Sequence, residues 1–146
     1  MEIFKIENFI KDHPNKQFPW FNTLSQIESQ KIFEKLKQKI NIAKKISHKA
    51  LVKKIHKKGR NINFANAESI EFDFEDLISH LNIKPNIKIY INWYHYDNID
   101  IILFREFCKY FDYIWYPSSD DIDLFDDDLS WVISVSHDGS INFVSL

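Results

Sequence analysis

Six aspartates lie within nine residues near the end of this 146-residue sequence, a density that could serve a metal ion, an active site or a basic partner. They are Asp120, Asp121, Asp123, Asp126, Asp127 and Asp128. In a helix-loop-helix calcium loop that starts at Asp121, Phe125 would occupy the position of an oxygen ligand. Asp126 would replace the required glycine, and Val132 would replace the required glutamate. The sequence therefore lacks that motif, and a non-standard Ca²⁺ or Mg²⁺ site stays open.

Apolar residues interrupt the aspartates at Ile122, Leu124 and Phe125, and we expect them to anchor the segment to the core. An anchored loop holds mutually repelling carboxylates in place, and a fixed patch of negative charge attracts a basic partner and accelerates the encounter. We therefore predict that all six aspartates are exposed and bind the partner. The alternative is a solvated connector without a binding role.

The histidines and the single cysteine give weaker indications of chemistry. His48 and His56 are eight residues apart with lysines between them, which does not match a helical zinc site. His95 has the spacing that would place it on the buried face of a predicted strand, and an aspartate follows two residues later. It is therefore the candidate base of a small metal-dependent hydrolase that would also use the six aspartates. Cys108 is expected to be a small core residue rather than a nucleophile.

No residue is assigned to catalysis or metal binding, and no cofactor is predicted. Gly59 and Gly139 are the two glycines of the chain, and neither has a partner at the spacing of a phosphate-binding loop. A lone cysteine cannot form an internal disulfide, and the charged N-terminal residues match neither a signal peptide nor a membrane span. We therefore expect a cytoplasmic protein without a membrane partner.

Charge is distributed unevenly along the chain, although the formal net charge is only −2. Residues 1–60 carry 15 Lys or Arg and 5 Asp or Glu, whereas residues 61–146 carry 4 and 16. Such asymmetry indicates a charged partner, unless the two halves face each other or the solvent. The lysines from Lys37 to Lys58 provide a second hypothesis, a nucleic-acid-binding module, but no DNA- or RNA-binding signature accompanies them.

Hydrophobic spacing indicates the helices that must position these residues. Overlapping cap signals at residues 23–28 begin a basic helical segment that ends at Gly59. Whether this segment is one long helix or two is open, and we favour two, with a break near Ser47. Residues 73–81 predict a short amphipathic helix that Asp73 can cap.

The second half of the chain alternates in the manner of strands. A small extended pair is predicted within residues 62–72, and a strand over residues 86–93. Helical spacing over residues 97–111 and a strand at residues 112–117 then complete a βαβ unit with parallel strands. Residues 131–143 predict a C-terminal hairpin.

The register of this hairpin follows from its apolar faces. A two-residue turn would pair Val135 with Asn142, whereas a three-residue loop pairs Val135 with Ile141. We predict the three-residue loop, with Gly139 in a left-handed conformation at a bulge.

These elements predict one α+β domain over residues 1–146, with N-terminal helices packed on a small mixed sheet of about four strands. The fold would include the βαβ unit and the C-terminal hairpin. Hydrophobic residues make up 45% of the chain and aromatic residues 16%, which is enough for a core without disulfides.

The C-terminal pattern WYP…DDIDLF…LSWVISVSHDGSINF resembles that of small bacterial proteins. The α+β build with an acidic loop is similar to immunity proteins of bacterial toxin systems, such as contact-dependent growth inhibition. This resemblance covers about thirty residues, carries no catalytic motif and transfers no site residues. It implies a binding protein rather than an enzyme, and its partner would be a cognate toxin, expected to be a basic nuclease.

Overall fold

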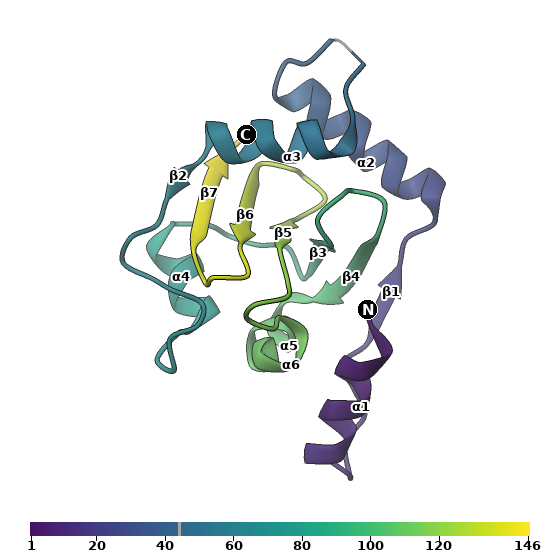
Figure 1. Cartoon of the computed structure of the whole chain (residues 1–146), viewed down its shortest axis with the longest axis vertical. Coiled ribbons are helices and arrows are strands. Elements are labelled where there is room, and N and C mark those ends of the chain that lie inside the picture. Colours follow the sequence, from purple (N-terminus) through teal and green to yellow (C-terminus); the bar gives the residue numbers. More distant parts are fainter. Residues whose placement is uncertain (44) are drawn as a thin grey trace.

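The computed structural model describes residues 1–43 and 45–146, which form six helices and seven strands (Figure 1). The helices are α1 (Ile3–Asp12), α2 (Gln26–Lys39), α3 (His48–Lys58), α4 (Phe74–His80), α5 (Phe104–Lys109) and α6 (Phe111–Ile114). The strands are β1 (Phe21–Thr23), β2 (Arg60–Asn61), β3 (Lys88–Asn92), β4 (Ile99–Leu103), β5 (Ile122–Phe125), β6 (Trp131–Val135) and β7 (Ile141–Ser145).

The strands form one sheet in the order β1-β4-β3-β5-β6-β7-β2, and every neighbouring pair is antiparallel. The α+β class is therefore confirmed. The sheet is larger than the predicted four strands, and it is antiparallel rather than mixed.

Helices cover both faces of the sheet, and each face has its own apolar core. Over one face, α2 and α3 place Phe33, Leu36 and Ile55 against Phe125 and Val132. Over the other face, α4, α5 and α6 pack on the alternate residues of the same strands. This division follows from the two-residue alternation of side chains along a strand.

Capping side chains explain where the helices begin. Ser25 and Glu28 form a capping box at the start of α2, and the Ser47 hydroxyl accepts a hydrogen bond from the Ala50 N–H at 3.2 Å. Asp73 caps α4 through its carboxylate. The predictions of two basic helices rather than one, and of a helix after Asp73, are confirmed.

The predicted βαβ unit is wrong. Ile99–Leu103 forms β4, which pairs with β3 on one side and with β1 on the other, so residues 97–111 do not form one helix. The apolar residues of β4 alternate between the two cores, and their continuation into α5 imitates helical spacing. Residues 111–114 form the short helix α6 instead of part of a strand.

The extended pair predicted within residues 62–72 is also wrong. Arg60–Asn61, just before this segment, forms β2 at the edge of the sheet. The residues that follow lie in turns, and the Ala67 N–H donates to the Gly139 carbonyl at 2.9 Å. The segment therefore packs beside the loop between β6 and β7.

The C-terminal hairpin has the predicted register. Val135 lies opposite Ile141 and Ile133 lies opposite Phe143. Gly139 has a φ of 75°, in the left-handed region that favours glycine. Val135, Ile133 and Ile141 are buried in one core, while Phe143 is partly buried at its margin.

Helix α1 projects from the lower end of the molecule in Figure 1. The ring of Phe9 holds it there through edge contacts with Tyr110 and Tyr113, at centroid distances of 5.1 and 5.3 Å. Neither α1 nor any other helix in the described ranges combines the length and apolar character needed to cross a membrane.

Candidate functional site

The structure separates the six aspartates instead of presenting them in one exposed loop. Three are buried, one is half-buried and two are exposed. The buried aspartates are Asp120, Asp123 and Asp126. Asp121 is half-buried, and Asp127 and Asp128 are exposed. The expected exposure is wrong for the first three because Ile122–Phe125 forms β5, a central strand between β3 and β6. Asp123 and Asp126 are 2% and 1% exposed, so they offer almost no surface to a partner, while Asp120 lines a surface hollow.

Asp123 belongs to a row of polar residues that crosses the sheet beneath α3. In neighbouring strands, this polar row consists of Asn92, Asp123, Ser134, Asn142 and Asn61. Asp123 accepts a hydrogen bond from the Ser134 hydroxyl at 2.5 Å and one from the Asn92 amide at 3.1 Å. These donors satisfy a carboxylate that is only 2% exposed.

His56 reaches the polar row from α3. Its Nε2 atom lies 3.1 Å from Asp123 Oδ1, and this hydrogen bond raises the pKa of His56 against the opposing effect of burial. Ser134 donates to the same carboxylate rather than to the imidazole, so His56 is not placed to activate Ser134 as a nucleophile. The polar row therefore holds α3 on the sheet and is not a hydrolytic triad.

Asp120 neutralises a buried cation. Lys5 of α1 is fully buried and forms an ion pair with Asp120. The Lys5 ammonium also donates to the Ile114 carbonyl at 2.8 Å and lies 4.2 Å from the centroid of the Trp93 ring. These contacts tie α1 to the body of the protein.

A hollow of about 370 Å³ adjoins this ion pair and is lined in part by His95, Asp120 and Asp121. The structure thus brings the candidate base His95 near two of the predicted aspartates. Asp120 is paired with Lys5, and Asp121 accepts a hydrogen bond from His137 at 2.9 Å. Among the described contacts, none joins the His95 ring to either carboxylate, so the hollow offers no prepared acid–base pair.

Asp126 directly follows β5 and is only 1% exposed. Its Oδ2 atom accepts a hydrogen bond from the indole N–H of Trp131 at 3.0 Å. Burial raises the pKa of Asp126, and the charges of Asp128 and Asp127 add to this rise, while the Trp131 hydrogen bond opposes it. The side-chain amide of Asn86 donates to both exposed neighbours, Asp127 and Asp128.

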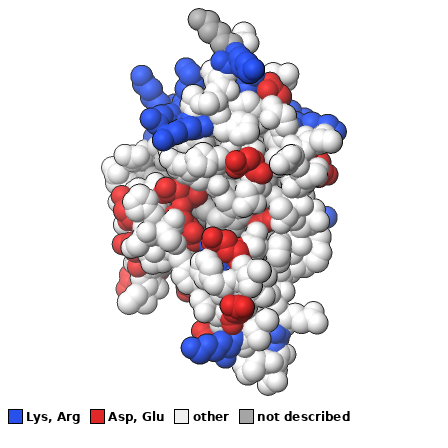
Figure 2. Space-filling model, turned by 45° about the vertical axis from the view of Figure 1, so that its right-hand side comes forward, with Lys and Arg blue, Asp and Glu red and all other residues white. Residues whose placement is uncertain are grey.

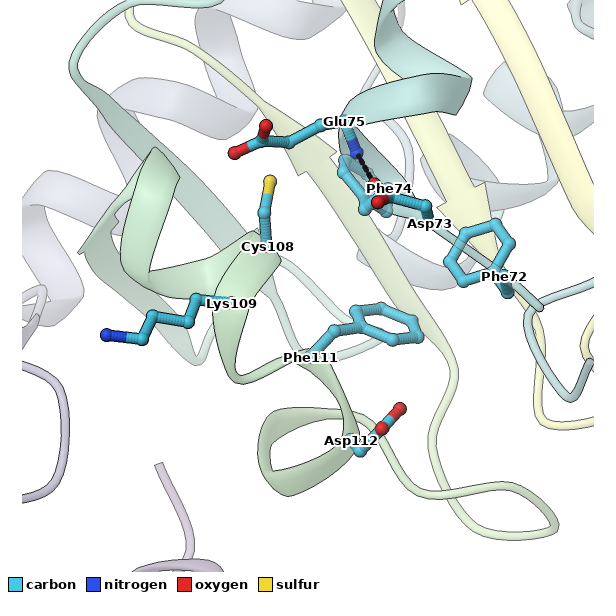
Figure 3. Close-up of a pocket in the computed structure, with 8 residues that line it drawn as sticks. All are labelled: Phe72, Asp73, Phe74, Glu75, Cys108, Lys109, Phe111 and Asp112. Carbon is cyan, nitrogen blue, oxygen red and sulfur yellow. Dashed lines mark hydrogen bonds between the residues drawn. The ribbon is translucent and has the colours of Figure 1, made fainter. Parts of the chain in front are cut away.

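A second group of carboxylates is exposed, and we call it the acidic surface. Its members are Glu68, Glu71, Asp73, Glu75, Asp76 and Asp112. Phe72, Phe74 and Phe111 line a hollow of about 260 Å³ between α4 and the α5–α6 segment (Figure 3). Phe72 also lines a neighbouring hollow with Phe64, where Glu71 and Asp76 stand at the rim. The acidic surface therefore surrounds two concave sites that contain aromatic side chains.

Cys108 lies in the first of these hollows, and Figure 3 shows its sulfur and the Glu75 carboxylate pointing toward one another. Burial raises the pKa of the Cys108 thiol to about 12, and the carboxylates of Glu75 and Asp73 add to the rise. Because the thiolate is the reactive form, Cys108 is a poor nucleophile at neutral pH. Cys108 is half-buried and packs at the margin of one core, not within it as expected.

Comparison with known protein families, with curated proteins and with solved structures finds no match to this chain. Only the chemistry of its own surface therefore indicates what the protein binds.

Basic residues gather at another part of that surface. Figure 2 shows Lys and Arg concentrated at the upper end of the molecule, where α2 and α3 lie, and most Asp and Glu below them. The exposed lysines of α3 are Lys49, Lys53, Lys54, Lys57 and Lys58, and none forms an ion pair with a described residue. The charge asymmetry of the sequence is thus also a separation in space.

The acidic surface was not predicted, although the sequence contains a signal for it. Residues 68–76 hold five carboxylates and no lysine or arginine. No comparable signal marked Lys5, because its partner Asp120 is 115 residues away along the chain.

Proposed function

We propose that this protein is a binding protein that neutralises a cognate bacterial toxin, as immunity proteins do, and that the toxin is basic, such as a nuclease domain. The observation that carries this proposal is the acidic surface, where five of the six exposed carboxylates line two hollows with aromatic walls and Lys109 is the one lysine or arginine among the lining residues of these hollows.

The acidic surface combines two features of protein-binding sites. Aromatic side chains anchor many interfaces because they bury a large area with few rotatable bonds. Phe64 is 63% exposed, Ile70 is fully exposed, and Phe72 lines both hollows. Carboxylates around such apolar groups suit Lys and Arg, whose stems pack on apolar surface while their charged heads pair with acids.

A nuclease fits this surface because its substrate groove must be positive to hold phosphates. The acidic surface would attract that groove at long range and compete with nucleic acid for it. Exposed charges are screened beyond about 10 Å at 0.1 M salt. We therefore expect the association rate with the toxin to fall steeply as ionic strength rises.

The test measures toxin inhibition, and association rates at low salt, with the toxin domain encoded beside the gene for this protein. One variant combines Glu71→Gln with Glu75→Gln, whose side chains make no hydrogen bond in the described structure. The matched variant combines Asp127→Asn with Asp128→Asn. We expect the first variant to weaken inhibition by about tenfold or more, equivalent to about 1.4 kcal/mol, and the second to inhibit like the wild type.

Two results would contradict this proposal. A wild-type protein that neither binds nor inhibits the neighbouring toxin would refute the function itself. Loss of inhibition only in the Asp127 and Asp128 variant would place the contact at the originally predicted loop and reject the acidic surface.

The exposed lysines at the end of the molecule where α2 and α3 lie favour a second candidate function, nucleic-acid binding. The exposed lysines of α3, which have no ion-pair partner among the described residues, are available for phosphate contacts. Salt-sensitive retention on DNA or RNA, lost when Lys53, Lys54, Lys57 and Lys58 are changed to glutamine, would support this candidate. Equal retention of the variant would reject it.

A further inference from the structure

Aromatic rings and carboxylates line the same surface hollow of about 370 Å³, which lies where two loops meet. The loop between β3 and β4 contributes the rings of Trp93, Tyr94 and His95. The segment before β5 contributes Asp120 and Asp121. We call this site the loop hollow. Rings and carboxylates on one concave surface are the groups that recognise organic cations in proteins.

Asp120 brings a nearly buried carboxylate to the loop hollow with one oxygen free. Its side chain is 8% exposed. The Oδ2 atom accepts hydrogen bonds from the Lys5 ammonium and, at 2.8 Å, from the Tyr116 N–H. No described residue donates to the Oδ1 atom, so this oxygen is the one left for a donor in the hollow. Because a carboxylate oxygen without a donor is costly away from water, a ligand that donates to it is favoured.

Asp121 repeats this arrangement at the next residue. Its Oδ1 atom accepts a hydrogen bond from the His137 N–H at 2.9 Å, and the Nδ1 atom of the His137 ring lies 2.9 Å from the same oxygen. The Oδ2 atom has no donor among the described residues. His137 therefore orients the carboxylate without using both of its oxygens. A ligand with several N–H groups could satisfy Asp120 and Asp121 together.

The charges around the loop hollow favour a cation. Lys5, which opposes one, is fully buried, is paired with Asp120 and lies 3.7 Å from Glu2. The amino group of Met1 is paired with Asp100. The described lining residues include no lysine or arginine, whereas three of them carry carboxylates, namely Glu2, Asp120 and Asp121.

Both loops that form the hollow hold a residue in the left-handed backbone region. Tyr94 has a φ of 75°, and Ser118, beside the hollow, has a φ of 66°. A bulky residue is uncommon in this region, and strained backbone persists most often where a site requires it. The conformation of Tyr94 is therefore consistent with a ring that is held for a ligand.

We propose that the loop hollow binds a guanidinium group, carried either by an arginine side chain of a protein partner or by a small guanidinium compound. A guanidinium is planar, presents five N–H donors in fixed directions and stacks on aromatic rings. Such a group can donate to Asp120 and Asp121 while its face packs on Tyr94. The ammonium of lysine is more strongly hydrated and has no flat face. The loop hollow shares no residue with the acidic surface, so this proposal does not depend on the toxin-binding function.

The experiment is a calorimetric titration of the full chain with three probes: Nα-acetyl-arginine methylamide, the corresponding lysine compound, and ethylguanidinium. The arginine probe should bind with a dissociation constant on the order of 10⁻³ M, and the lysine probe about fivefold more weakly or less. Tighter binding of the arginine probe than of ethylguanidinium would assign the site to a protein side chain. Ethylguanidinium that binds at least as tightly would assign it to small compounds.

Three variants test the residues that carry the proposal. Asp121→Asn keeps an acceptor for His137, removes the charge and should weaken binding of the arginine probe by about tenfold. Asp97→Asn is the matched control, because it removes one charge from the exposed tip of the β3–β4 loop without lining the hollow, and it should leave the affinity unchanged. Tyr94→Asn removes the ring but tolerates a positive φ, and it should weaken binding by about two- to fivefold.

Three results would overturn the proposal. The first is no saturable binding of the arginine probe up to about 20 mM, well above the expected dissociation constant. The second is equal affinity for the arginine and lysine probes. The third is equal weakening by Asp97→Asn and Asp121→Asn, which would show that the probe follows diffuse negative charge. Circular dichroism checks that the three variants remain folded.

Discussion

Replacing Asp123 by asparagine tests whether its carboxylate organises the polar row. Asparagine keeps the size of the side chain, but it removes the negative charge and turns one acceptor into a donor. A hydrogen bond to a charged group contributes about 1.5–3 kcal/mol to stability, against about 0.5–1.5 kcal/mol for a neutral one. Each fully buried bond of Asp123 should therefore lose about 1 kcal/mol.

Two of the three hydrogen bonds to Asp123 are fully buried. Ser134 and Asn92 are 2% and 0% exposed, whereas the side chain of His56 is 37% exposed and is screened by water. We therefore count only the bonds from Ser134 and Asn92 and expect Asp123→Asn to lower the free energy of unfolding by about 2 kcal/mol. Asp123→Ala leaves both donors without an acceptor and should cost more, about 2–6 kcal/mol.

Urea unfolding followed by circular dichroism and tryptophan fluorescence measures these differences. Ser134→Ala is the matched control, because it removes one donor and leaves the carboxylate with Asn92 and His56. This control should cost about 1.5–3 kcal/mol, the contribution of one hydrogen bond to a charged group. A loss below about 0.5 kcal/mol for Asp123→Asn, within the range of ordinary surface substitutions, would refute the idea that this carboxylate organises the row.

Four further predictions follow from the same structure. The raised pKa of His56 means that its protonated form stabilises the fold below the ordinary value of 6.5, and that this contribution is lost as pH rises through the raised value. Thermal unfolding of His56→Gln should therefore show a deficit against the wild type at acidic pH that disappears at alkaline pH. Lys5→Met leaves the buried carboxylate of Asp120 without its cationic partner and should lower the free energy of unfolding, measured in urea, by about 3–5 kcal/mol. Adding Asp120→Asn should restore part of this stability. Cys108, with a thiol pKa of about 12, should resist alkylation at neutral pH until the protein unfolds, as mass spectrometry can show. Gly139→Val should lower the melting temperature more than Gly139→Asn, because asparagine accepts a φ of 75° far better than a β-branched residue.

The parts of the fold that the sequence predicted correctly depend on neighbouring residues. Ser25, Ser47 and Asp73 cap helices through amides two or three residues away, so local patterns reveal them. The C-terminal hairpin was predictable for a related reason. Its register follows from matching two short apolar faces across one loop, and Gly139 supplies the conformation that the loop requires.

The parts that failed depend on contacts between distant residues. The apolar residues of residues 97–111 do have helical spacing. However, Ile99–Leu103 forms a strand because β1 and β3 pair with it from both sides. Pairing with strands from elsewhere in the chain commonly overrides local preference. The aspartates were misjudged because the groups that satisfy Asp120 and Asp123, such as Lys5 and Asn92, lie far away in sequence.

The distinction between buried and exposed carboxylates also changes where a partner would be attracted. A carboxylate paired with an ammonium or surrounded by buried donors projects little field into solvent, as is the case for Asp120 and Asp123. The carboxylates of residues 68–76 have no cationic partner among the described side chains and face water. Half of the conspicuous aspartates therefore lie in the interior of this protein, while a less conspicuous run carries the field that would guide a basic partner.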